Sequence, residues 1–214
     1  FIIPIYLGDT TEKIILIMVT REDLFAAPFF YGNVDLDEEK LKESIENTNI
    51  LYGLVSEDFD ILHGSFDWLY GPVNRFVIEV MEEMEFYGPH SIFTSWLTAT
   101  FKENEIKSQD HMHMNSFMSG TLYLTENPSP LMFKNPLPWR FQNNESAMNI
   151  TGKLASNKYV YQPQKGEIIM FPSHVWHQIQ SNDSEDPRYS IAFNVLPTGT
   201  LGNWDSTVNL KVIK

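Results

Sequence analysis

The sequence contains no cysteine. A chain without thiols has no disulfide framework, no thiolate metal site and no cysteine nucleophile. It also has no uninterrupted apolar run close to the roughly 18 residues that a membrane helix needs. The apolar opening FIIPIY is short and has no basic leader, so it does not match a signal peptide. These absences predict a cytoplasmic protein with no membrane partner.

Basic residues are scarce. Fifteen Lys and Arg stand against 28 Asp and Glu, which gives a formal net charge of −13. Such a chain has no basic stripe with which to displace counterions from phosphates, so we expect no nucleic-acid partner. A small-molecule or peptide substrate fits this charge better. The 214 residues are 43% hydrophobic and 14% aromatic, which predicts a single globular domain over 1–214 with a sizeable core.

The period of the hydrophobic pattern changes near residue 90. Before it, 13–20 reads as a buried strand, and 36–48 and 71–88 read as amphipathic helices. After it, apolar residues alternate with polar ones in seven segments separated by Asn, Ser, Pro and Gly. The seven expected strands are 91–101, 119–125, 130–136, 158–163, 166–172, 188–197 and 206–214, with a long polar loop at 138–157. Residues 1–90 should therefore form N-terminal strands and supporting helices, and 91–214 a β-sandwich or barrel core.

Two histidines stand one residue apart in SQDHMHMNSFMSGTLYL, residues 108–124. If His111 and His113 lie on one strand, their imidazoles point to the same face and can share an ion. A third ligand could come from His174 or His177, in FPSHVWHQI. Imidazole suits a borderline metal such as Fe(II), and three protein ligands leave open positions for chemistry.

Three segments together resemble a known family. HMHMNSFMSGTLYL, KGEIIMFPSHVWHQI and RYSIAFNVLP are similar to the 2-oxoglutarate and Fe(II)-dependent oxygenases. They are most like the bacterial and phage branch that carries an H-x-H-x-x-S-x-x-S-G-x-x-Y block. The resemblance spans most of the chain and is strongest over 91–197. It implies a mainly β fold with flanking helices, the double-stranded β-helix or cupin-like jelly-roll. It also implies a dioxygenase that decarboxylates 2-oxoglutarate to succinate while hydroxylating a substrate.

The resemblance implies His111, His113 and His177 as the catalytic Fe(II) ligands. The wider superfamily usually has H-x-D or H-x-E where this chain has H-x-H, so His113 replaces a carboxylate and makes the centre one charge more positive. Asp110 and Asn115 are nearby polar residues that could replace one histidine. We rank Asp110 low because its parity on a strand is opposite to that of the two histidines.

The cosubstrate site is also implied by the resemblance. Arg188 would grip the distal carboxylate of 2-oxoglutarate, with Ser190 beside it in an R-x-S arrangement. A planar guanidinium suits this role because it pairs with a carboxylate through two parallel hydrogen bonds. Strand periodicity places Asn194 on the same face as Arg188. Tyr123 shares the parity of the two histidines if the strand is continuous, and its phenol could donate a hydrogen bond to the cosubstrate.

Two other readings stay open. Cupins share the β-helix and an H-x-H pair, and GEIIMFPSHVWH approaches their second block. Their first block, however, requires a Glu four or five residues after the second histidine, where this chain has Phe117 and Met118. A catalytically inactive binding module of the same fold is the third reading. Arg188 favours the oxygenase over the cupin, and titration with iron and 2-oxoglutarate separates both from a binding module.

Overall fold

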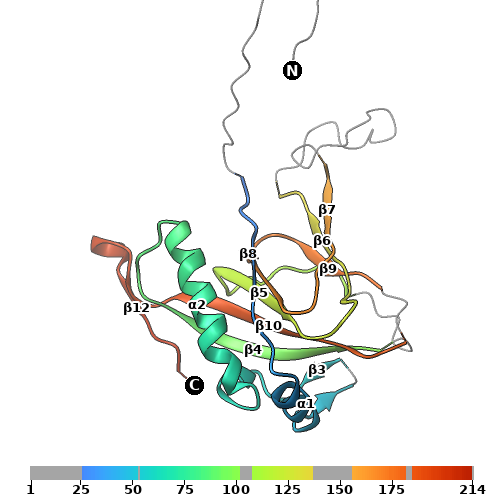
Figure 1. The fold of residues 1–214 in the computed structure, drawn as a ribbon. Coiled ribbons are helices and arrows are strands. Elements are labelled where there is room, and N and C mark those ends of the chain that lie inside the picture. The colour runs from blue at the N-terminus through green and yellow to red at the C-terminus, as the bar shows by residue number, and fades with distance from the viewer. Residues whose placement is uncertain (1–25, 53, 102–107, 137–155, 182–184, 214) are drawn as a thin grey trace, which may run out of the picture.

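The computed structural model describes residues 26–52, 54–101, 108–136, 156–181 and 185–213 (Figure 1). The predicted strand at 13–20 and nearly all of the predicted loop at 138–157 lie outside these residues. None of the helices within the described ranges is long and apolar enough to cross a membrane.

Among the described residues, two α-helices and a short 3-10 turn form the helical layer. Helix α1 spans Glu38–Glu46 and begins at Asp37, whose carboxylate accepts hydrogen bonds from the backbone N–H groups of Glu39 and Lys40 at 3.2 Å. This cap satisfies two of the donors that a helix start leaves free. The 3-10 turn η1 covers Ile61–His63, and helix α2 covers Asp67–Glu83.

Helix α2 begins four residues before the predicted start at Gly71. The sequence favours a start at Gly71–Pro72, since proline is common in a first helical turn. In the structure Pro72 lies inside the helix. Phe66 and Leu69 are fully buried on either side of the true start, so tertiary packing extends the helix towards the N-terminus.

In the part of the chain that the structure describes, seven strands form the larger sheet, and every pairing between them is antiparallel. A second sheet has three antiparallel strands, in the order β7-β6-β9. A separate hairpin joins β11, Gly199–Leu201, to β12, Val208–Leu210, with the 3-10 turn η3 at Trp204–Ser206 between them. In spatial order the larger sheet consists of β1 Phe30–Asn33, β8 Glu167–Pro172, β5 Met118–Tyr123, β10 Arg188–Pro197, β4 His90–Thr100, β3 Val55–Ser56 and β2 Ile50–Leu51. The smaller sheet consists of β7 Lys158–Tyr161, β6 Leu131–Lys134 and β9 His177–Ile179.

The larger sheet is covered on both faces. Helix α2 packs against one face, where its buried residues meet Ile191, Phe193 and Val195 of β10 in the main core (Figure 1). The smaller sheet faces the other side and encloses a second core around Phe133 and Phe171. This arrangement is the double-stranded β-helix with flanking helices that the sequence predicted.

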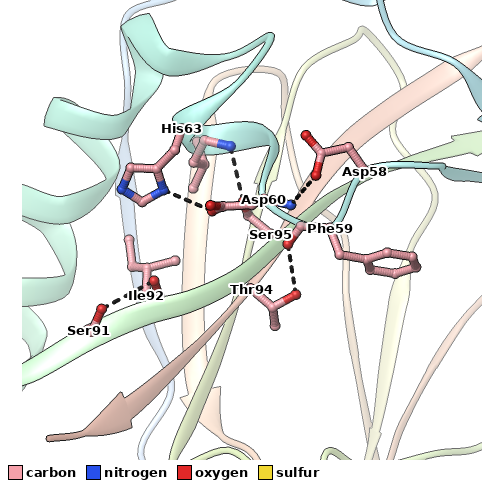
Figure 2. A network of polar contacts seen from close by, with 9 residues as sticks. Asp58, Phe59, Asp60, His63, Ser91, Ile92, Thr94 and Ser95 are labelled. Atoms are coloured by element: carbon pink, nitrogen blue, oxygen red, sulfur yellow. Dashed lines mark hydrogen bonds and ion pairs between the residues drawn. The ribbon is translucent and has the colours of Figure 1, made fainter. Parts of the chain in front are cut away.

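The segment between β3 and η1 is tied to β4 by a polar network, shown in Figure 2. The carbonyl of Phe59 accepts hydrogen bonds from the Ser95 N–H at 2.8 Å and from the Thr94 hydroxyl at 3.0 Å. Asp58 accepts from the N–H of Asp60 at 2.8 Å. These contacts hold the backbone of Phe59 against β4.

Candidate metal centre and cosubstrate pocket

The H-x-H pair does not lie on a regular strand, which corrects the prediction from parity. His111 and His177 form an isolated antiparallel bridge, with reciprocal N–H to carbonyl hydrogen bonds of 3.0 and 2.9 Å. The N–H of His113 donates to the carbonyl of Ser173 at 3.0 Å. The chain then turns, and β5 begins only at Met118. The hydroxyl of Ser116 donates a hydrogen bond to the carbonyl of Met118 across this turn.

The three predicted ligands nevertheless meet in space. His111, His113 and His177 each offer one ring nitrogen, and these three atoms lie within 4.8 Å of one another. The ring centroids are 4.3 to 5.2 Å apart, and the rings of His113 and His177 are nearly parallel. His177 is buried, whereas the other two are half-buried. Three converging imidazoles are a donor set suited to a divalent transition metal.

Backbone carbonyls fix the tautomers of two of these rings. Nδ1 of His111 lies 2.8 Å from the carbonyl of Gln109, and Nδ1 of His177 lies 2.9 Å from the carbonyl of Val175. A carbonyl only accepts, so Nδ1 carries the proton in both rings and Nε2 keeps its lone pair for the cluster. Within the described part of the chain the ring of His113 has no such hydrogen bond. Instead, it is stacked on the indole of Trp96, with ring centroids 5.9 Å apart and an angle of 26° between the planes.

Burial keeps two of the three rings neutral. It lowers the pKa of His113 from 6.5 to about 4, and the nearby His111 adds to the effect. Burial also lowers the pKa of His177 to about 4, against the opposing hydrogen bond to Val175. A metal ligand must be an unprotonated imidazole, so near neutral pH these two rings need lose no proton before binding an ion.

The alternative ligands lie elsewhere. The side chain of His174 is exposed and is outside the cluster. A carboxylate oxygen of Asp110 accepts a short ion-pair contact from Lys134 on β6. Asn115 is exposed in the turn that follows the histidine pair. The structure therefore groups His177, and not these three residues, with the H-x-H pair.

A cavity of about 290 Å³ opens beside the histidines, between the two sheets. We call this space the metal lobe. Its wall includes Trp96 and Thr98 of β4, Ser119 and Thr121 of β5, and Asn194 of β10. A smaller hollow adjoins it, and the two have six lining residues in common, which are Thr98, Thr100, Thr121, Leu131, Ile179 and Ala192. The two spaces therefore adjoin along these shared residues.

The smaller hollow, the arginine lobe, contains Arg188, Ser190 and Tyr123. Arg188 is only 4% exposed. The hydroxyl of Tyr123 is buried and has no hydrogen-bond partner among the described residues. Burial raises the pKa of Tyr123, so its phenol remains protonated and can donate a hydrogen bond. A buried cation with an unused phenol donor is an arrangement that fits a carboxylate-bearing ligand.

Asn194 lies in the metal lobe and not beside Arg188. Its Oδ1 accepts a hydrogen bond of 2.7 Å from Ser119, whose hydroxyl also lies 2.8 Å from that of Ser173. Ser173 in turn donates to Ser116 at 2.9 Å. This buried chain of hydroxyl groups links the turn after the H-x-H pair to β5, β10 and the segment that carries His177.

Sequence reasoning missed the residues of β4 that line the cavity. Trp96, Thr98 and Thr100 alternate along the strand and face the site. The alternation is visible in SWLTAT, residues 95–100. It could have indicated one polar face, but it does not distinguish a face turned to a cavity from one turned to solvent.

Comparisons with known proteins agree with this geometry. Residues 94–194 match the family model described as "Putative 2OG-Fe(II) oxygenase". The comparison with curated proteins gives no match. Among solved structures, the chain is similar to the non-heme alpha-ketoglutarate-dependent epimerase SnoN from nogalamycin biosynthesis, with 12% identity, a TM-score of 0.56, and 80% of this chain and 79% of that chain covered.

Two further structures are similar at low identity. A Pseudomonas putida prolyl-4-hydroxylase is 11% identical, with a TM-score of 0.53 and 80% of this chain and 93% of that chain covered. HygX from Streptomyces hygroscopicus, solved with nickel and 2-oxoglutarate bound, is 10% identical, with a TM-score of 0.52 and coverage of 80% and 84%. The chain therefore has the double-stranded β-helix fold of these structures, and its residues 94–194 are similar to the 2-oxoglutarate and Fe(II)-dependent oxygenases.

Proposed function

We propose that the protein is a non-haem Fe(II) dioxygenase that couples the oxidative decarboxylation of 2-oxoglutarate to the hydroxylation of an uncharged group on a small molecule or peptide. One observation carries the proposal: two adjoining hollows, which share six lining residues, place three converging imidazoles beside a buried arginine. The first group fits a divalent metal and the second fits the far carboxylate of a ketoacid. A cupin reading accounts for the histidines but gives Arg188 and Tyr123 no ligand.

The residues present fit both cofactors. His111 and His177 would present Nε2 to the metal, and His113 would supply the third nitrogen. Bound Fe(II) supplies the one-electron chemistry with dioxygen that amino-acid side chains lack. Arg188 would hold the distal carboxylate of 2-oxoglutarate, and the Tyr123 phenol would donate to the same ligand. Their burial excludes water and strengthens both contacts.

The lining of the metal lobe supports an uncharged substrate group. Apart from the histidines, its described residues are apolar or neutral polar, with no carboxylate, lysine or arginine. A charged group entering this space would lose its hydration without gaining a partner.

Substitution of Arg188 tests the cosubstrate site. Arg188→Ala should weaken 2-oxoglutarate binding by about 2–4 kcal/mol, because a charge-assisted pair is lost and a buried carboxylate is left unpaired. Anaerobic calorimetric titration of the Fe(II)-loaded protein measures this change, and iron binding should persist. Arg75→Ala, on the exposed side of α2, is the matched control and should bind as the wild type does. Equal affinities for wild type and Arg188→Ala would remove Arg188 from the site. If the wild-type protein releases no succinate under oxygen, the proposed activity is wrong.

A further inference from the structure

The three imidazoles of the metal centre are held in different ways. His111 and His177 each donate Nδ1–H to a backbone carbonyl, which fixes both the tautomer and the ring plane. His113 has only its backbone N–H anchored, by the carbonyl of Ser173. For its ring, the described residues offer no hydrogen-bond partner. The ring contacts that remain are with the other two histidines and with Trp96.

Trp96 is itself held firmly. Its neighbours on β4, Ser95 and Leu97, are fully buried, and the strand pairs with β10 along its whole length. The ring of Phe59 lies 6.2 Å from that of Trp96, at an angle of 46°. The carbonyl of Phe59 is bonded to both Thr94 and Ser95 (Figure 2). The indole therefore meets His113 as part of the rigid sheet.

We propose that Trp96 is the positioning residue for His113, its indole face orienting the imidazole as the backbone carbonyls orient His111 and His177. This inference rests on the metal centre of the proposed function. A flat contact restrains rotation of the ring about its Cβ–Cγ bond, whereas it does not fix which ring nitrogen carries the proton. His113 is thus the ligand whose geometry depends on a side chain and not on the backbone, and it is the ligand most easily displaced.

A double-mutant cycle read by metal binding tests this role. Co(II) is titrated into the protein without oxygen, and its visible absorption bands report both affinity and coordination. Trp96→Leu should weaken Co(II) binding about tenfold, the scale of losing an orienting partner of a ligand. Its bands should shift relative to those of wild type. Trp96→Phe keeps an aromatic face and should stay within about threefold of wild type. In a His113→Asp background, which keeps a third ligand but has no imidazole to stack on the indole, Trp96→Leu should change nothing further, because its effect passes through the ring of His113.

Every other outcome contradicts either the role of Trp96 or the metal centre on which that role rests. Wild type that fails to bind Co(II) contradicts the metal centre itself. Wild type that binds while Trp96→Leu binds equally well contradicts only the role of Trp96. Additive effects in the cycle mean that Trp96 acts on the fold and not through His113. If Trp96→Leu does not fold, Phe59→Ala decides, because Phe59 is 53% exposed and its removal leaves the core intact. That variant should show the same band shift with a smaller loss of affinity, and unchanged bands would refute the proposal.

Discussion

At the scale of single residues, two histidines in one short turn have opposite environments. His177 is 5% exposed and its Nδ1 is fixed by Val175, whereas His174 is exposed to solvent. His177→Ala should abolish stoichiometric Fe(II) binding, because only two of the three imidazole ligands remain. His174→Ala should bind iron as the wild type does. Anaerobic iron titration measures both, and iron retained by His177→Ala would show that the third ligand is a different residue.

The ligands of the centre could be predicted from the sequence, but the groups that orient them could not. Histidines at 111, 113 and 177 stand out because the chain has only six. The carbonyls of Gln109 and Val175 could not be predicted, since any residue supplies a carbonyl and only the turn geometry aims it. Trp96 lies on a strand remote in sequence from the histidines, and nothing in its local pattern indicates a contact with them.

At the scale of elements, a close approach between strands depends on Gly120. It lies in β5 between β8 and β10, and a Cβ added there would meet the ring of Phe193 at 2.2 Å and the carbonyl oxygen of Ile169 at 2.8 Å. Both neighbours are fully buried, so neither can move freely. Gly120→Ala should therefore lower the free energy of unfolding by about 1–3 kcal/mol, as overpacking does.

The same substitution at Gly71 is the control. Gly71 lies within α2, and nothing stands within 4 Å of an added Cβ. Alanine there should leave stability unchanged or raise it by about 0.5–1 kcal/mol, because glycine is a poor helix former. Urea unfolding of the two variants compares them directly. Equal changes in the free energy of unfolding would show that the sheet accommodates the added Cβ at Gly120 with little destabilisation.

Strands were easier to predict than the loops that carry the ligands. The period of 2 located β4, β5, β8 and β10 because each buries one or both faces, and burial imposes a pattern. The path of the segment 111–117 was not predicted, because it depends on a hydrogen bond from the N–H of His113 to the carbonyl of Ser173 and on one from the hydroxyl of Ser116 to the carbonyl of Met118. Such bonds leave no periodic trace. The start of α2 failed for a related reason, since the burial of Phe66 outweighs the preference of the Gly-Pro pair.

At the scale of the whole molecule, His113 and His177 link stability to pH. The pKa of His113 and that of His177 are about 4 in the folded protein, below the ordinary value of 6.5. As pH falls below 6.5, these two histidines become protonated in the unfolded chain but stay neutral in the folded protein. The free energy of unfolding therefore declines until the pH reaches the folded pKa. The metal-free protein should therefore unfold at a lower urea concentration at pH 4.5 than at pH 7.5.

A variant carrying both His113→Leu and His177→Leu separates this effect from the titration of the 28 acidic residues. Its urea midpoint should change less between the two pH values than that of wild type. A parallel decline in the two proteins would place the acid sensitivity outside the histidine cluster.

The backbone bridge between His111 and His177 joins positions 66 residues apart in the chain. A bound ion would close this same loop through side chains, and so would act as a reversible cross-link. If the unfolded chain kept this link, the closed loop would lower its conformational entropy considerably. Binding that occurs only in the folded state adds directly to stability. Metal supply would then control how long the folded protein persists, in addition to whether its site is complete.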